Sequence, residues 1–292
     1  MEKFNLENYL TVSIEHMIKN ILKASLKNPA ASVFFMQYAK HMRKAEEIRK
    51  EEERHGNHIP AFLIGSITTQ CNLHCKGCYA RANHSCFDGS SEGMPALLSA
   101  EKWGEIFEEA AGLGIGFCIL IGGEPFIRKD VLLKAGQQKK MLFPIFTNGT
   151  IIDDAYLSLL KANRNLLPVL SIEGEQKTTD ERRGNGVYEK LHVTMQNLKK
   201  AGIFYGASIT VHKENLDEVL SDHFIDTLEE SGCHAVFYVE YVPTTEESRK
   251  IVLEDKEREI LMKRLAELRK EREEMMFLAF PGDEESSGGC LA

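Results

Sequence analysis

The chain has 292 residues, of which 43% are hydrophobic, so it can form one large domain or two of ordinary size. Its net charge of −8 gives no general attraction to nucleic acid or to an anionic membrane surface. No secretory signal and no apolar run long enough to cross a bilayer is visible, and seven cysteines cannot all pair as disulfides. These features predict a cytoplasmic protein with reduced thiols, no membrane partner and a disfavoured role for nucleic acid.

The first part of the chain has a helical pattern over residues 5–55, with an expected break at Asn28 and Pro29. Apolar residues recur at helical intervals before the break. The segment ends in a run of charged residues that is typical of a solvated helix face. We therefore expect residues 1–58 to form an N-terminal helical extension.

From residue 61 onward, short apolar runs alternate with amphipathic segments. The runs are rich in Ile, Val, Phe and Leu, as expected for strands that are covered on both faces. They cover residues 61–68, 115–121, 142–146, 166–172, 203–211 and 235–242.

Helical patterns separate the apolar runs. Ser99 and Asp153 each precede such a pattern as candidate N-caps, and the last pattern is a long charged helix over residues 254–277. Alternation of strands and helices predicts an α/β fold with parallel strands and right-handed crossovers. Six units are too few for a closed eight-stranded barrel, so the periodicity leaves open a partial barrel and a doubly wound sheet.

In both architectures, chemistry gathers at the carboxyl ends of the parallel strands. The most unusual residues of the chain follow the predicted strands at that edge. In chain order they are Cys71, Cys75 and Cys78, then Gly122, Gly123, Glu124 and Pro125, then Thr147, Asn148 and Gly149, and then Glu173 and Gly174.

The three cysteines have the spacing C-x3-C-x2-C, which is compatible with two kinds of metal site. A structural zinc ion needs four ligands, and His74, His84 or Cys86 could supply the fourth, although no second C-x2-C pair is present. A 4Fe–4S cluster held by three thiolates keeps one iron free for a small molecule, and we favour this interpretation of the spacing.

The second predicted strand runs directly into the sequence GGEP. Two glycines allow the backbone to come close to a ligand, and Pro125 makes the exit from the turn rigid. Glu124 can accept hydrogen bonds from an ammonium group. Taken alone, the same four residues also fit an ordinary strand-to-helix turn.

Together, CNLHCKGCYA and GGEP resemble the signature of the radical S-adenosylmethionine (radical SAM) superfamily. The resemblance implies a partial (βα)6 TIM-like barrel of parallel strands over residues 59–245, followed by a C-terminal helix and linker over 246–292. Members with SPASM or twitch extensions look most similar. One departure concerns the aromatic residue that usually precedes the last cysteine: here that position is Gly77, and the aromatic Tyr79 follows Cys78.

The resemblance also implies a role for each matching residue. Cys71, Cys75 and Cys78 would ligate three irons of a 4Fe–4S cluster, and S-adenosylmethionine would chelate the fourth. The positions that match cosubstrate-binding residues are Gly122, Gly123 and Glu124 for the methionyl amino group, Thr147 and Asn148 at the end of the third strand, Ser171 and Glu173 for the ribose, Arg183 for the methionyl carboxylate, and Tyr79 beside the adenine.

The implied activity is reductive cleavage of S-adenosylmethionine to methionine and a 5′-deoxyadenosyl radical that abstracts hydrogen. An electron donor such as flavodoxin or ferredoxin and a peptide or protein substrate are the expected partners. A nucleotide cyclase of the molybdenum-cofactor type and an RNA-modifying enzyme are alternatives within the resemblance. A zinc-stabilised binding module without catalytic activity is the alternative from a different class.

The remaining cysteines and histidines have weaker signals. Cys118 and Cys233 are expected as small buried hydrophobic residues, and His192 and His223 as ordinary core or surface residues. Cys290 stands alone in a Gly/Ser-rich end, from which we expect the enzyme to continue into a domain with auxiliary clusters.

Overall fold

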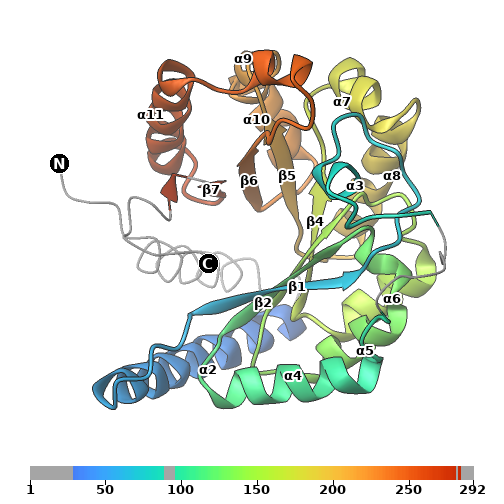
Figure 1. Ribbon diagram of the computed structural model, residues 1–292. Coiled ribbons are helices and arrows are strands. Elements are labelled where there is room, and N and C mark those ends of the chain that lie inside the picture. Colours follow the sequence, from blue (N-terminus) through green and yellow to red (C-terminus); the bar gives the residue numbers. More distant parts are fainter. Residues whose placement is uncertain (1–28, 89–95, 281, 284–292) are drawn as a thin grey trace.

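The computed structural model describes residues 29–88, 96–280, 282 and 283 (Figure 1). The predictions for residues 5–28 and for Cys290 lie outside this part of the chain. None of the helices that it contains is long and apolar enough to span a membrane.

Seven strands form one parallel sheet whose spatial order is the order of the chain, β1 to β7. Because this order never reverses, the sheet is not doubly wound, and it curls into a half-barrel with helices on its convex side (Figure 1). The partial-barrel prediction is confirmed. The strands are β1 (Phe62–Thr68), β2 (Phe117–Gly122), β3 (Phe143–Thr147), β4 (Leu166–Ser171), β5 (Gly206–Val211), β6 (Ala235–Glu240) and β7 (Met276–Phe280).

The helices between the strands also match their sequence signals. Ser99 caps α4, since its hydroxyl accepts from the N–H of Lys102, and Asp153 caps α6 in the same way through Tyr156. The elements outside the sheet are α2 (Pro29–Arg54), α3 (Tyr79–Ala82), α4 (Ala100–Gly112), η1 (Pro125–Ile127), α5 (Lys129–Gln137), α6 (Asp154–Ala162), α7 (Gln176–Arg183), α8 (Val187–Lys200), α9 (Leu216–Val219), α10 (Asp222–Glu230), η2 (Glu247–Ile251) and α11 (Asp255–Glu271).

Helix α2 packs against the end of the sheet that is opposite to the cysteines. The hydroxyl of Tyr38 donates to the carbonyl of Gly116 over 3.2 Å, and Arg49 donates to the carbonyl of Gly114. Gly114 has a φ of +84°, and a Cβ there would lie 2.6 Å from the carbonyl oxygen of Ala45. Glycine therefore allows α2 to approach the turn before β2 closely.

The seventh strand corrects the sequence prediction, which extended the last helix to residue 277. Helix α11 ends at Glu271, and Met276–Phe280 pairs in parallel with β6 over five residues. The run MFLAF is almost entirely buried, the pattern of a parallel strand that is covered on both faces. Its position directly after a charged helix concealed it, because a short apolar run can extend a helix or form a strand.

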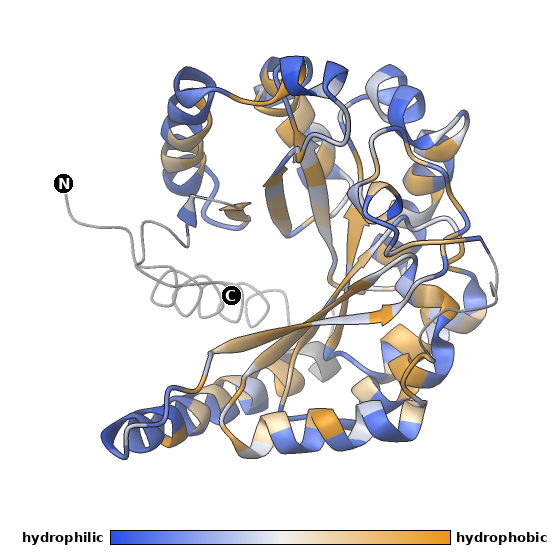
Figure 2. Cartoon of the chain, in the orientation of Figure 1, coloured by the Kyte–Doolittle hydropathy of each residue, from blue (hydrophilic) through white to orange (hydrophobic). Residues whose placement is uncertain are grey.

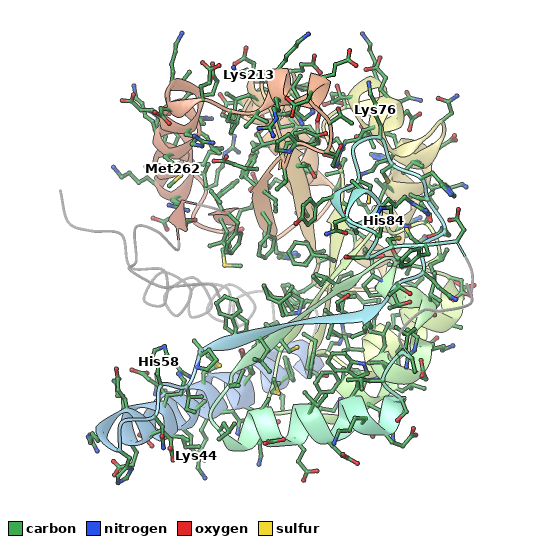
Figure 3. All side chains as sticks on the ribbon, viewed as in Figure 1. Lys44, His58, Lys76, His84, Lys213 and Met262 are labelled. Atoms are coloured by element: carbon green, nitrogen blue, oxygen red, sulfur yellow. The ribbon has the colours of Figure 1, made fainter. Side chains whose placement is uncertain are left out.

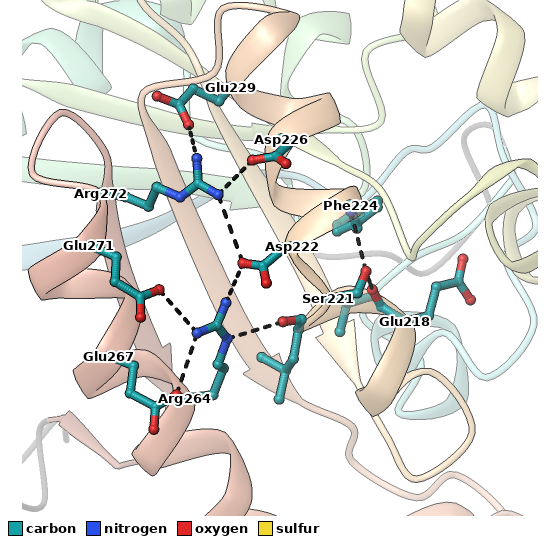
Figure 4. Close-up of polar contacts among 12 residues, drawn as sticks. Glu218, Ser221, Asp222, Phe224, Asp226, Glu229, Arg264, Glu267, Glu271 and Arg272 are labelled. Atoms are coloured by element: carbon teal, nitrogen blue, oxygen red, sulfur yellow. Dashed lines mark hydrogen bonds and ion pairs between the residues drawn. The ribbon is translucent and has the colours of Figure 1, made fainter.

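Ion pairs hold α11 against α10 and so place β7 beside β6 (Figure 4). Arg264 contacts Asp222 over 2.6 Å, and Arg272 contacts Asp226 over 2.6 Å and Glu229 over 3.0 Å. The pairs are partly exposed, so each contributes modestly to stability and the group acts as a network.

The core has two parts. The larger part lies between the sheet and the outer helices, whose apolar faces turn inward (Figure 2). The smaller part lies on the concave side, where Val169, Phe237 and Leu278 pack together. An apolar pocket extends from this second cluster to the start of the strands, and both Phe35 of α2 and His234 line it.

His234 is a mostly buried histidine in an apolar place. Its ring lies 4.4 Å from that of Phe204, and its Nδ1 is buried with no hydrogen-bond partner in the described part of the chain. Burial lowers the pKa of His234 from 6.5 to about 4. The folded state therefore holds the imidazole neutral at neutral pH.

We expect His234 to make the fold sensitive to acid. In the unfolded chain His234 is protonated below pH 6.5, whereas in the folded chain it is protonated only below about pH 4. The free energy of unfolding therefore decreases as the pH falls from 6.5 to 4. The free energy of unfolding should be lower at pH 4 than at pH 7 by roughly 2–3 kcal/mol because of this residue. Urea unfolding between pH 7 and pH 4 should show it in the parent chain and in the exposed control His223→Phe, but not in His234→Phe. Identical pH profiles for all three chains would contradict the prediction.

Candidate active site

The sequence-predicted residues meet at the carboxyl edge of β1 to β4. The register of β1 shifts between Ser66 and Thr68, which pairs with Gly122 of β2, so β1 is irregular just before the cysteine-bearing loop. This loop covers residues 71–78 and lies beside α7, where the N–H of Lys76 donates to the carbonyl of Arg182 over 2.7 Å (Figure 3).

The GGE segment is joined through the backbone to the residues that lead into the cysteine-bearing loop. The N–H of Gly123 donates to the carbonyl of Thr68 over 2.8 Å, and the N–H of Glu124 donates to the carbonyl of Gln70 over 2.7 Å. A Cβ on Gly123 would overlap the carbonyl oxygen of Gln70 and lie 3.0 Å from the backbone nitrogen of Cys71. The close approach that this glycine allows is thus to the cysteine-bearing loop, whereas the sequence suggested an approach to a ligand.

Replacing Gly123 by valine should therefore disturb the cysteines themselves. The new side chain would push the Gln70–Cys71 backbone away, so the variant should lose bound iron as well as affinity for S-adenosylmethionine. Gly112→Val is a suitable control, because no atom lies within 4 Å of a Cβ built on Gly112. Iron content after anaerobic reconstitution is the measurement. A Gly123→Val chain with the iron content of the control would show that the two loops are not coupled.

The Glu124 carboxylate joins β2 to the end of β3. It is 1% exposed and accepts from the hydroxyl of Thr147 and the N–H of Asn148, both over 2.7 Å, and from the N–H of Phe126 over 3.0 Å. Burial raises the pKa of Glu124, while these three hydrogen bonds oppose the shift. Within the described part of the chain, Oε2 accepts only the bond from Asn148, so one lone pair of this oxygen is available to a further donor.

A polar network beside Cys71 joins the predicted Asn148 to Asn72, which the sequence did not single out. Asn148 Nδ2 donates to Asn72 Oδ1 over 2.8 Å and lies 3.9 Å from the sulfur of Cys71. Asn72 in turn donates to the hydroxyl of Thr150 over 2.9 Å. The only sequence signal for Asn72 was its place directly after Cys71. The network links the first cysteine to the end of β3.

The thiols are partly or mostly buried. Burial raises the pKa of Cys71 to about 11 and also raises that of Cys75, where the guanidinium groups of Arg183 and Arg182 oppose the shift. Protonated thiols must lose their protons when they bind a metal, and nearby cations favour that loss. The two arginines therefore suit Cys75 to be a metal ligand.

The candidates for a fourth zinc ligand are differently placed. His74 lies 2.9 Å from Asp88 on the surface, and Cys86 is buried close to Cys71. In the residues described, no three His, Cys, Asp or Glu side chains converge on a point where one metal ion could bind. A four-iron cluster takes each thiolate at a different iron, so its ligands need not converge in this way.

Glu173 is a fully buried carboxylate beside the cysteine-bearing loop. Its Oε1 accepts from Arg182 and from Arg183, and its Oε2 accepts from the N–H of Thr210 over 3.1 Å. Burial is the largest influence on the pKa of Arg183 and tends to lower it, but the charge and hydrogen bond of Glu173 and the nearby thiols of Cys75 and Cys78 together outweigh burial, so the pKa is raised. Two positive charges on one carboxylate leave a net positive charge near Cys75.

The other predicted residues lie on the same edge. Ser171 ends β4 and pairs in register with Ser208 of β5, and Tyr79 begins α3 with 56% of its surface exposed. Contacts of Ser171, Glu173 and Tyr79 with a cosubstrate remain predictions. Cys118 and Cys233 are buried core residues away from this edge, as predicted.

A protein-family model described as the Radical SAM superfamily matches residues 66–224, which is more than half of the chain. The chain belongs to the radical SAM superfamily. Members of this superfamily bind a 4Fe–4S cluster and S-adenosylmethionine, and the related proteins are enzymes. The matched range contains the three cysteines, the GGE segment and Arg183.

Two curated relatives show the range of radical SAM enzymes that this chain resembles. Fe-coproporphyrin III synthase of Methanosarcina barkeri is 30% identical over 58% of this chain and 41% of its own length. The sporulation killing factor maturation protein SkfB of Bacillus subtilis is 28% identical over 56% of this chain and 38% of its own length. The chain thus spans about two fifths of the length of these relatives.

Solved structures support the same fold. Streptococcus suis SuiB bound to S-adenosylmethionine superimposes with a TM-score of 0.63 and 16% identity, over 84% of this chain and 56% of that protein. At this level of identity the likeness shows the fold alone.

The residues of this site fit the cofactor of the superfamily. Three thiols lie at one edge of the half-barrel, and cationic side chains stand beside Cys75. Thiolates are the ligands that iron–sulfur clusters use, and nearby positive charge favours the anionic form of a thiol.

Proposed function

We propose that Cys71, Cys75 and Cys78 hold a 4Fe–4S cluster and that the chain uses S-adenosylmethionine to abstract hydrogen from a peptide or protein. The observation that carries the first part is the backbone connection of Gly123 and Glu124 to Thr68 and Gln70, directly before the cysteine-bearing loop. It sets a candidate metal site and a candidate cosubstrate site side by side. When bound, the cluster would supply the single electron that cleaves S-adenosylmethionine to methionine and a 5′-deoxyadenosyl radical.

The side chains of this edge would orient the cosubstrate. Oε2 of Glu124 has a lone pair for the methionyl ammonium group. Arg183 donates to Glu173 through Nε and Nη2, which leaves Nη1 without a partner among the described residues and available to the methionyl carboxylate. Thr147, Asn148, Gly122 and Gly123 would complete the contacts with the methionyl part of the cosubstrate.

The chain would contribute orientation and exclusion of water rather than acid–base chemistry. Three hydrogen bonds fix Glu124, and the Glu173 carboxylate fixes Arg183, so neither group has to reorganise when the cosubstrate binds. Ser171, Glu173 and Tyr79 would complete the contacts with ribose and adenine. The ribose contact of Glu173 would have to use Oε2, which accepts a single bond from the residues that the structure describes. Flavodoxin or ferredoxin is the proposed electron donor.

A peptide or protein substrate is supported by the relatives and by the open barrel. SkfB is a maturation protein, PqqA peptide cyclase of Granulibacter bethesdensis is 28% identical over 55% of this chain, and SuiB has been solved with its precursor peptide. In the part of the chain that is described, β1 and β7 do not pair, so the half-barrel is open on one side. Such an opening can admit a segment of polypeptide.

A tetrapyrrole is the second candidate substrate. Fe-coproporphyrin III synthase is 30% identical over 58% of this chain, and AdoMet-dependent heme synthase of Methanosarcina barkeri is 28% identical over 63% of this chain. The concave side of the sheet is also apolar enough to contact a macrocycle.

Two probes distinguish these substrate classes. The genes that neighbour this one should first be searched for a short peptide, and the reconstituted chain should form 5′-deoxyadenosine faster with such a peptide than with buffer alone. Fe-coproporphyrin III should have no such effect. Acceleration by the porphyrin and none by the peptide would overturn the peptide proposal and support the second candidate.

A further inference from the structure

Cys75 and Cys78 occupy the first and last positions of a single β-turn. The N–H of Cys78 donates to the carbonyl of Cys75 over 3.2 Å, and Lys76 and Gly77 are the two central residues. Gly77 has a φ of +66°, which a type II turn requires at its third position. The shape of this turn therefore sets how the two thiols are placed relative to each other.

The side-chain position of Gly77 is filled by Tyr241, which follows β6. A Cβ on Gly77 would lie 2.5 Å from Oη, 3.0 Å from Cε2 and 3.1 Å from Cζ of Tyr241. Tyr241 is 6% exposed, and its N–H donates to the carbonyl of Val211 over 3.0 Å. The ring of His212 meets the tyrosine ring edge-on at 6.1 Å. Both the backbone and the ring of Tyr241 are thus held by the β5–β6 end of the sheet.

The turn is held from its other side by α7. The N–H of Lys76 donates to the carbonyl of Arg182, so the two central residues of the turn have separate supports. One support is the hydrogen bond to Arg182 of α7, and the other is the aromatic ring of Tyr241, which directly follows β6. The four residues of the turn, two of which are cysteines, are therefore held by Arg182 and Tyr241. Both lie more than 100 positions later in the sequence.

We propose that Tyr241 is a positioning residue that acts through Gly77 to hold Cys75 and Cys78 in the geometry that a cluster needs. Tyr241, which directly follows β6, supplies the aromatic ring that the cysteine-bearing loop lacks at position 77. The inference rests on the proposed cluster role of these cysteines. It predicts that filling the space beside the glycine carries the effect and that Tyr241→Phe keeps it, because Cε2 and Cζ of the ring lie within 3.1 Å of the Cβ position and the nearer Oη makes no hydrogen bond in the described part of the chain.

The test is the rate at which reconstituted protein loses iron to a chelator under anaerobic conditions. Tyr241→Ala should lose iron about 10-fold faster than the parent chain, the usual scale for residues that support metal ligands. Tyr241→Phe should lose it at the parental rate. Tyr205→Ala is the matched control, since Tyr205 is buried at the opposite end of β5 and its loss should lower stability without changing iron release. Equal rates for Tyr241→Ala and Tyr205→Ala would overturn the inference.

A double-mutant cycle gives a second test, which does not depend on the folding of Tyr241→Ala alone. Gly77→Ala should lose iron rapidly, because the new methyl group meets the tyrosine and because alanine is strained at a φ of +66°. Gly77→Ala combined with Tyr241→Ala should recover part of the retention, together with the electron paramagnetic resonance line shape of the reduced parent. Strictly additive losses would contradict the proposed contact. Undiminished iron in a chain without Cys71, Cys75 and Cys78 would instead refute the proposed function.

Discussion

Replacing Cys75 by alanine should give a folded chain that no longer retains about four irons and four sulfides after anaerobic reconstitution. Cys75 lies in a β-turn with Cys78, and Arg182 and Arg183 favour its thiolate form. Because each of the three thiolates would bind a different iron, the loss of one leaves two irons without a protein ligand. We therefore expect the brown colour and the sulfide content to be lost together.

Two further variants sharpen this prediction. Cys233→Ala removes a buried thiol whose hydrogen bond goes to the carbonyl of Ala235, and it should keep the full cluster. Cys86 lies near Cys71 and could replace a lost ligand, so Cys75→Ala should also be made together with Cys86→Ser. If the variant that lacks Cys71, Cys75 and Cys78 keeps the iron and sulfide of the parent, the cysteines are not the ligands.

Replacing Glu173 by glutamine should cost about 3 kcal/mol of folding free energy. The glutamine has a similar shape, but it leaves the guanidinium groups of Arg182 and Arg183 without a counter-charge. Their side chains are only 16% and 10% exposed, so water compensates little of the loss. Removing one partner of a buried ion pair is costly because the remaining charge stays buried.

Urea unfolding measures this effect directly. The control is Glu181→Gln on the same helix, since Glu181 is 67% exposed and its pair with Lys177 spans 3.9 Å. We expect a change of about 0.5 kcal/mol or less for that variant. A Glu173→Gln chain as stable as the control would show that the two arginines do not depend on this carboxylate.

The sequence predicted most of the fold because most elements have an unambiguous local signal. The six apolar runs became β1 to β6, and the helix caps at Ser99 and Asp153 are formed as expected. The strand Met276–Phe280 was missed because five apolar residues after a long helix have no period of their own. The register of a parallel sheet, which gives β7 its place beside β6, depends on contacts that are distant in sequence.

The site was predicted at the level of residues and not of contacts. The motif spacing identified the cysteines and the GGE segment. It could not reveal that Gly123 faces Gln70, or that Tyr241 covers Gly77. These contacts join loops from different strands, and a one-dimensional pattern contains no distance between such loops. The pairing of Glu173 with two adjacent arginines was hidden for the same reason.

Cleavage of S-adenosylmethionine tests the central claim most directly. The reconstituted chain, reduced under anaerobic conditions, should convert S-adenosylmethionine to equal amounts of methionine and 5′-deoxyadenosine. The chain with alanine at positions 71, 75 and 78 should form neither product. Unchanged S-adenosylmethionine in the presence of a fully loaded parent chain, or equal product from the chain without these cysteines, would contradict the account.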